Sequence, residues 1–236
     1  MIGVEAGRLL TILPLLIIYK KVPVIKEEEA VTLRSQLSIL KDSKILTALA
    51  ITLLYVGGYA TLFTYISPFL QATSTLSITE ISGILFLAGI CSFLGSRVGG
   101  QLADAKGSRF TICFGLLLQA TTLLLFALSG INLFVLILVL MIFMLATWSI
   151  SPAQQLFLVT LVPRNPDIAL SVNTSFIQFG FALGSALGGF VIVRTSVLNL
   201  NWVGFGTVSI ALFLAIMLFK KMNSRIKTSI VTKVKY

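Results

Sequence analysis

The stretch Gly100-Gln-Leu-Ala-Asp104-Ala-Lys106-Gly107-Ser-Arg109 is a compact polar segment between two long apolar ones. A polar segment this short cannot cross a bilayer, whose hydrocarbon core is about 30 Å thick. Its glycines permit the close backbone approach and the positive φ that a chain reversal requires. The sequence therefore predicts a tight reversal between two membrane-spanning helices at one face of a membrane.

The composition of the whole chain also indicates a membrane protein. Of its 236 residues, 57% are hydrophobic and 11% are charged, and the mean hydropathy is +1.02. A soluble domain carries about 25% charged residues, so most of this surface is expected to face lipid. The formal net charge of +10 does not indicate nucleic-acid binding, because the basic residues lie in short gaps between apolar runs and near the C-terminus.

Residues for enzymatic or metal chemistry are missing from the sequence. It contains no His, and its two cysteines, Cys91 and Cys113, lie inside apolar runs without metal-ligand spacing. It offers no nucleophile–base pair, no paired carboxylates and no phosphate-binding Gly-rich loop. We therefore expect a protein that is not an enzyme, with no metal and no cofactor, and without ATP as its energy source.

Charge-poor runs predict an all-α bundle of six transmembrane helices in residues 45–219. A spanning helix needs about 20 mostly apolar residues. The predicted spans are 45–70, 81–97, 110–129, 133–161, 168–193 and 202–219. The long uncharged run 110–163 is divided at Ser129-Gly130-Ile131-Asn132, because these residue types favour turns.

The basic residues orient this bundle. With six spans, one side of the membrane receives every Lys and Arg except Arg8 and Arg194. These residues are Lys20, Lys21, Lys26, Arg34, Lys41, Lys44, Arg97, Lys106, Arg109, Arg164, Lys220, Lys221, Arg225, Lys227, Lys233 and Lys235. The side rich in Lys and Arg is expected to be cytoplasmic, which places both ends of the bundle in the cytoplasm of a cell-membrane protein.

The segments outside the bundle are predicted as follows. Residues 1–22 form a partial apolar helix, interpreted as the end of a preceding span, and a cleaved signal peptide is not expected. Residues 23–44 form a charged cytoplasmic linker, and residues 220–236 a basic cytoplasmic tail. Within the linker, Leu33, Leu37 and Leu40 fit either an amphipathic surface helix or a plain solvated segment. Asp42 or Ser43 is expected to cap the first span.

Three stretches resemble one known family. The spacing Gly-x-Leu-Ala-Asp-x-x-Gly-x-Arg of residues 100–109 resembles the helix-connecting motif of the major facilitator superfamily. Residues 169–189 resemble the eleventh helix of bacterial drug and sugar efflux permeases. Residues 148–163, with Pro152, Gln154 and Gln155, are similar to the tenth helix of the arabinose-efflux-like group. The resemblance covers about residues 9–219 and implies the C-terminal six-helix half of such a permease, similar to drug:proton antiporters.

The resemblance implies functional roles for particular residues. Gly100, Asp104, Gly107 and Arg109 are expected to form a gating segment, in which Asp104 holds one face of the transporter closed and is released during alternation. From spacing alone, Asp104 can also stabilise a helix N-terminus or pair with Arg109. A soluble turn without any gating role remains the alternative.

Candidate cavity residues come from the first and fourth predicted spans. Tyr55 and Tyr59 lie one helical turn apart, and Gly57-Gly58 between them is a point where the helix is expected to bend easily. A stripe on the fourth span is expected to face the bundle interior, because polar groups facing lipid are costly. The stripe consists of Met144, Trp148, Ser151 and Gln155. The resemblance implies that both helices line the substrate cavity, whereas packing is the alternative role.

In the fifth span, Gly180, Gly184 and Gly188 recur at every fourth residue. This pattern predicts a helix face on which a neighbouring helix packs closely, and structural packing is favoured over substrate contact.

The function that these features predict is secondary active efflux of a small molecule, either a sugar or a drug-like compound. The predicted spans contain no mid-membrane acidic or basic residue, so proton coupling is implied only by the resemblance, for the complete protein. The alternative is a truncated or non-transporting membrane protein, inactive unless joined by an N-terminal half or a second copy. The expected partners are the lipid bilayer, the substrate and such a half.

Overall fold

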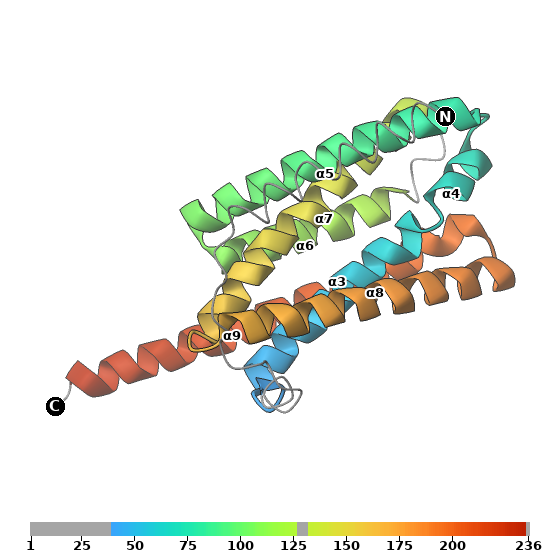
Figure 1. Cartoon of the computed structure of the whole chain (residues 1–236). Helices are drawn as coiled ribbons and strands as arrows, with labels where there is room; N and C mark the ends of the chain where they lie inside the picture. Colours follow the sequence, from blue (N-terminus) through green and yellow to red (C-terminus); the bar gives the residue numbers. More distant parts are fainter. Residues whose placement is uncertain (1–38, 127–131, 235–236) are drawn as a thin grey trace, which may run out of the picture. The chain divides into compact units, whose positions relative to one another are not determined.

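A computed structural model describes residues 39–126 and 132–234, with side chains described up to residue 224. Every element of regular secondary structure assigned in these residues is a helix (Figure 1). They are α3 (Ser43–Phe63), α4 (Ile66–Thr73), α5 (Ile78–Lys106), α6 (Ser108–Phe126), α7 (Leu133–Leu161), α8 (Pro166–Arg194), the 3-10 helix η2 (Val197–Asn199) and α9 (Leu200–Val234). The predicted helix 1–22, most of the linker 23–44, and Ser129-Gly130-Ile131 lie outside the described residues.

The predicted all-α fold and its six spans are confirmed. Six of the described helical segments are long and apolar enough to cross a membrane. They are Ser43–Phe63, Ile78–Lys106, Ser108–Phe126, Leu133–Leu161, Pro166–Arg194 and Val197–Ser224. The chain is therefore a multi-pass membrane protein whose outer helix surfaces contact lipid.

The first predicted span, 45–70, is wrong in one respect, since it consists of two helices. α3 ends at Phe63, α4 begins at Ile66, and Tyr65 between them has the non-helical angles φ −113° and ψ 22°. The cause is Pro68, which has no N–H to donate to the carbonyl of Thr64 and whose ring would clash with that carbonyl. A new helix starting at Ile66 places Pro68 in a first turn, where no such donor is needed. Gly57-Gly58, in contrast, lies within continuous helix.

The predicted reversal at 100–109 is shorter than expected. α5 begins with a capping box, in which Ser77 and Glu80 satisfy each other's backbone N–H groups. It continues through Gly100 and Asp104 to Lys106. Gly107, with φ 88° and ψ 149°, alone separates α5 from α6, because one residue in a conformation open to glycine is enough to reverse the chain.

This geometry predicts opposite effects of alanine at the two glycines. Gly107→Ala is expected to lower the free energy of unfolding by about 2 kcal/mol, because an L side chain is strained at this φ and ψ. Gly100→Ala is the matched control: its Cβ would meet nothing within 4 Å, so stability is expected to rise by up to about 1 kcal/mol. Thermal unfolding in detergent, followed by tryptophan fluorescence, measures both. Equal destabilisation would contradict the assignment of the reversal to Gly107.

The other helix ends are also explained locally. The predicted cap at Asp42 is confirmed, since its Oδ1 accepts the backbone N–H of Lys44 at 2.8 Å. Asn132, at the end of the predicted turn cluster, caps α7 by accepting the N–H of Phe134. α9 runs without interruption past Lys220, where the basic tail was predicted to begin, to Val234.

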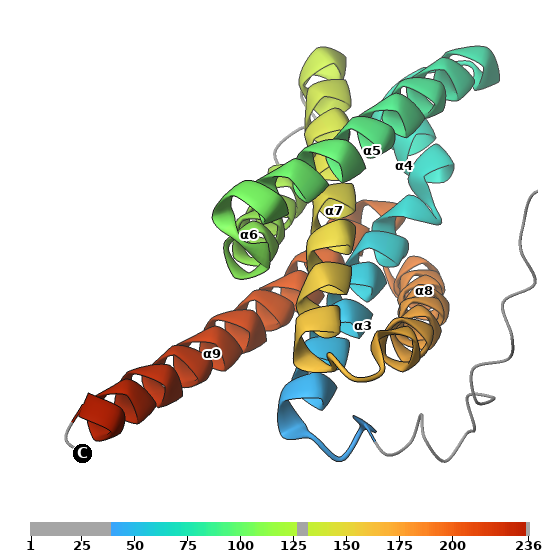
Figure 2. The same ribbon diagram turned by 60° about the vertical axis from the view of Figure 1, so that its left-hand side comes forward.

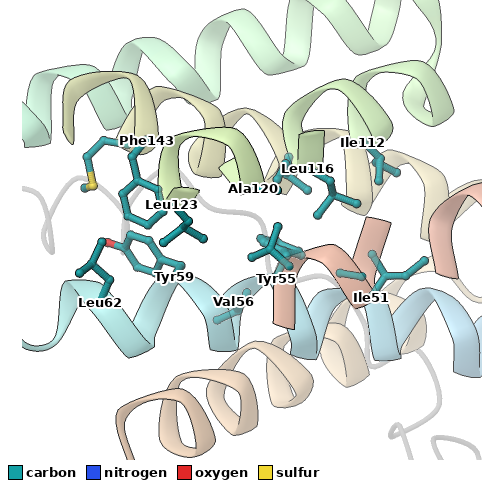
Figure 3. Close-up of a cluster of buried hydrophobic side chains, with 14 of the residues drawn as sticks. Ile51, Tyr55, Val56, Tyr59, Leu62, Ile112, Leu116, Ala120, Leu123 and Phe143 are labelled. Atoms are coloured by element: carbon teal, nitrogen blue, oxygen red, sulfur yellow. The ribbon is translucent and has the colours of Figure 1, made fainter. Parts of the chain in front are cut away.

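The helices pack in a small number of extended pairs. α5 packs along α7, α3 along both α8 and α9, and α6 along α7 and α9 (Figure 2). Tyr55, Tyr59 and Leu62 of α3 meet Leu116 of α6 and Phe143 of α7 in the buried core (Figure 3). α3 is thereby surrounded by α7, α8 and α9. A buried site is therefore expected where α3 contacts these helices.

Candidate functional site

A small pocket lies where α3, α7 and α8 meet. Its volume is about 100 Å³, and most of its lining is apolar. The lining residues are Tyr55, Val56 and Tyr59 of α3, Thr147, Trp148 and Ser151 of α7, and Ile177 and Phe181 of α8. A pocket of this size holds a fragment of a small molecule and is well below the few hundred cubic ångströms of a typical ligand site.

Aromatic rings form one wall of this pocket. The ring of Tyr59 stacks on Phe63 at 4.9 Å between centroids and on Phe143 at 5.8 Å. Phe181 of α8 meets the same ring edge-on at 5.7 Å. These contacts fix Tyr59 in place, since offset and edge-on ring pairs are attractive. The indole of Trp148 is 39% exposed and is the part of the wall that is open to the surroundings.

Polar groups occur at a few positions on the same wall. The Tyr55 hydroxyl lies beside Ser151, and the Tyr59 hydroxyl lies beside Trp148. The hydroxyl of Thr147 is buried and has no hydrogen-bond partner among the described residues. A buried unpaired hydroxyl is unfavourable, and because this one has almost no accessible surface it is not open to a ligand in the pocket.

The six cavity residues singled out by the sequence occupy three kinds of environment. Tyr55, Tyr59, Trp148 and Ser151 line the pocket. Met144, in contrast, is buried in the apolar core. Gln155 is exposed, and its Nε2 lies 3.4 Å from the Ser151 hydroxyl. Gln155 therefore does not line this pocket, and its neighbour Gln154 takes the buried position at this level of α7.

Gln154 is the centre of a buried polar network that sequence reasoning missed. Its Nε2 donates to the carbonyl of Ala48 at 2.7 Å and to the hydroxyl of Thr52 at 3.0 Å. The Thr52 hydroxyl donates in turn to Oδ1 of Asn173 at 2.8 Å. The network therefore joins α7, α3 and α8. A signal was present in the sequence, since Thr52, Gln154 and Asn173 are polar residues inside three apolar spans.

A second buried amide supports the same region from another side. Nε2 of Gln119 on α6 donates to the carbonyl of Tyr55 at 3.2 Å. The Oε1 atoms of Gln119 and Gln154 have no partner among the described residues. Gln154 thus connects α3 to α7, and Gln119 connects α3 to α6.

The predicted gating segment has a different arrangement from the one that its spacing suggested. Asp104 is exposed near the end of α5, and no hydrogen bond or ion pair of its side chain occurs within the described residues. Arg109, its suggested partner, donates from Nη1 to Oδ1 of Asn223 on α9 at 2.7 Å. Lys106 lies 5.2 Å from the ring centroid of Phe110. The segment is thus attached to α9 through Arg109, and Asp104 is available for other partners.

The three glycines of α8 lie against α3. A Cβ on Gly180 would stand 2.8 Å from the Leu53 carbonyl oxygen, and one on Gly184 would overlap the backbone of Gly57. A Cβ on Gly188 would lie 2.8 Å from the carbonyl oxygen of Thr61. The Thr61 hydroxyl also donates to the Gly184 carbonyl at 3.1 Å. The two backbones are therefore in direct contact along this face.

Sequence reasoning missed an equivalent contact between α5 and α7. A Cβ on Gly95 would lie 2.5 Å from the Leu145 carbonyl oxygen, and one on Gly99 would overlap the backbone of Ser149. Gly95 and Gly99 have the same spacing of four residues as the glycines of α8, so the sequence pattern also predicts this contact.

Comparison with known proteins gives consistent results. A sequence profile of the Major Facilitator Superfamily matches residues 11–233. The relative named "Uncharacterized MFS-type transporter YbcL", from Bacillus subtilis (strain 168), is 33% identical over 89% of this chain and 54% of its own length. The "Inner membrane transport protein YdhP" of Escherichia coli (strain K12) is 31% identical over 67% of this chain and 41% of its own length.

A further relative is similar over nearly the whole chain. The "Probable sugar efflux transporter" of Mannheimia succiniciproducens is 26% identical over 99% of this chain and 57% of its own length. The chain thus spans about half the length of the curated relatives it matches.

Proposed function

Because this chain belongs to the major facilitator superfamily, we propose that it forms the C-terminal six-helix half of a permease for secondary active efflux of a small molecule. The six spans and the similarity to transport proteins support this proposal. Family membership indicates a transporter and not an enzyme. In the proposed protein, this half works together with an N-terminal half or with a second copy of the chain.

The observation that carries the proposal is the pocket on α3, α7 and α8. Its lining offers the partly exposed ring of Trp148 and the half-buried hydroxyl of Ser151 to a substrate. Tyr55, Tyr59, Trp148 and Ser151 are the proposed substrate contacts. Its volume of about 100 Å³ fits one part of a substrate, and the remainder would be enclosed by the second half.

We propose a sugar as the substrate, with a flat drug-like compound as the alternative. The name of the Mannheimia relative, a probable sugar efflux transporter, supports the first. Aromatic faces together with hydroxyl groups suit sugars by stacking and hydrogen bonding, and they equally suit amphipathic drugs. Proton coupling is proposed for the complete protein, and its test is loss of efflux when a protonophore collapses the pH gradient.

Trp148→Ala tests the pocket as the substrate site. In cells loaded with labelled arabinose or with ethidium, the ratio of the two efflux rates is expected to change about three- to tenfold, because one aromatic contact is worth about 0.5–1.5 kcal/mol. Membrane abundance should stay unchanged. The matched control is Trp202→Ala, at the start of α9, which should leave the ratio as it was. Loss of abundance alone, with the ratio preserved, would assign Trp148 to packing.

The size of the polypeptide in its own membrane tests the assignment to one half. An antibody against the basic C-terminal segment is expected to detect a band at about twice the 25.6 kDa of this chain under denaturing conditions. A band at 25.6 kDa would instead require a separate partner or self-association. Crosslinking in the membrane would then distinguish a dimer from a monomer. A monomer would support the alternative proposal, a membrane protein that does not transport.

Asp104→Asn tests the proposed gating segment, Gly100, Asp104, Gly107 and Arg109. We expect altered labelling of a cysteine introduced by Gln101→Cys, in a background where Cys91 and Cys113 are replaced by Ala. The reason is that Asp104 is exposed and free to pair with another part of the permease when one face closes. Asp167→Asn, at another exposed Asp, is the control. Unchanged labelling together with unchanged efflux would leave Asp104 as a simple surface residue.

A further inference from the structure

A groove runs between the start of α3 and the middle of α9, on the side predicted to be cytoplasmic. Its volume is about 360 Å³. The lining residues are Asp42, Ser43, Lys44, Thr47, Leu214, Met217, Leu218 and Lys221. None of these residues belongs to the proposed substrate pocket, and the groove lies at the start of α3, before the turns that carry Tyr55 and Tyr59.

One end of this groove is basic. Lys44 and Lys221 line it from opposite helices, and Lys220 is exposed beside it on α9. The carboxylate of Asp42 is the one acidic group in the lining, and its Oδ1 is occupied by the backbone N–H of Lys44. The charge of Asp42 is set against the positive end of the α3 dipole, which leaves Lys44 and Lys221 as the remaining charges of the lining. The basic end therefore favours an anion.

The other end of the groove is apolar. Leu214 and Met217 lie about one to two helical turns along α9 from Lys221, which corresponds to roughly 6–10 Å at 1.5 Å per residue. Met217 is 57% exposed and Leu218 is buried. Moving from Lys221 to Leu214 leads from the end of the span toward its middle, so the apolar end extends into the hydrocarbon region.

We propose that this groove binds one anionic phospholipid of the cytoplasmic leaflet. The phosphate headgroup pairs with Lys44 and Lys221, and an acyl chain lies along Leu214 and Met217. Basic pockets between transmembrane helices on the cytoplasmic side attract anionic headgroups. A free phosphate ion would satisfy the lysines but would leave the apolar half of the groove uncovered, so the combination of both ends favours a lipid.

A bound lipid of this kind would connect α3 and α9 at their cytoplasmic ends. The proposal depends on the membrane orientation of the chain and not on its transport function.

Native mass spectrometry of the detergent-solubilised chain tests the proposal. The probes are phosphatidylglycerol and phosphatidylcholine with identical acyl chains. We expect one phosphatidylglycerol to be retained by the unmodified chain. In the variant Lys44→Gln/Lys221→Gln, retention should fall by about thirtyfold, since each basic side chain near an anionic headgroup contributes about fivefold. The control Lys106→Gln/Arg164→Gln removes the same charge at positions away from the groove and should retain the lipid.

Two further measurements distinguish a lipid from other ligands. Met217→Trp fills the apolar end and is expected to weaken retention while both lysines remain. Glycerophosphoglycerol, which has the headgroup without acyl chains, should not displace the lipid at equal concentration. Equal losses in the two double variants, equal retention of both lipids, an unaffected Met217→Trp variant, or displacement by the acyl-free headgroup would each overturn the proposal.

Discussion

Gly99→Ala is expected to destabilise the bundle by about 3 kcal/mol or more, at the upper end of the cost of overpacking a core. The new Cβ would overlap the backbone of Ser149, whose Cα would lie 2.5 Å away. Backbone atoms cannot rotate aside as a side chain can, so α5 and α7 would have to separate. Loss of their close contact would remove packing along much of both helices.

Gly89→Ala on the same helix is the control for this prediction. A Cβ at Gly89 would meet nothing within 4 Å, so the substitution is expected to leave stability unchanged or to raise it by up to about 1 kcal/mol. Thermal unfolding in detergent by tryptophan fluorescence, with size-exclusion profiles as a second readout, measures both variants. Similar melting temperatures for the two variants would show that α5 and α7 tolerate a wider separation.

Gln154→Leu is expected to lower the free energy of unfolding by about 1–3 kcal/mol, the cost of leaving buried polar groups unpaired. The substitution keeps the approximate size of the side chain but removes its bonds to the Ala48 carbonyl and the Thr52 hydroxyl. Gln155→Leu, one residue further along α7, is the matched control. Gln155 is exposed, and the bond of its amide to Ser151 is long at 3.4 Å, so little change is expected.

A double-mutant cycle with Thr52→Val tests the network itself. If Gln154 and Thr52 act through their shared hydrogen bond, the double variant should be less destabilised than the sum of the single variants. Thermal unfolding of the four proteins gives the coupling. Additive effects, or an equal loss from Gln155→Leu, would mean that Gln154 stabilises α7 by packing and not by joining it to α3 and α8.

The spans could be predicted from the sequence because the hydropathy of about 20 consecutive residues is a local property. It does not depend on contacts with other helices. The break at Tyr65 also had a local cause in Pro68, but the apolar run through it concealed the break. The Asp42 cap depended on chemistry within a few residues and was predicted correctly.

The site was only partly predictable because its details depend on contacts between helices. Helical spacing groups Trp148, Ser151 and Gln155 on one stripe, but it cannot tell how far α7 is rotated against α3 and α8. That rotation places Gln154 inside and Gln155 outside. Likewise, Arg109 bonds to Asn223, more than a hundred residues away in sequence, and no spacing rule within residues 100–109 contains that contact.

The glycine contacts have a mechanical consequence. Where two backbones touch, no side chain lies between them to change its rotamer, so α5 with α7 and α3 with α8 are each expected to move as a rigid helix pair. Trp148 of the pocket belongs to the first pair, and Tyr59 and Phe181 belong to the second. A small tilt of one pair against the other would therefore change the width of the pocket.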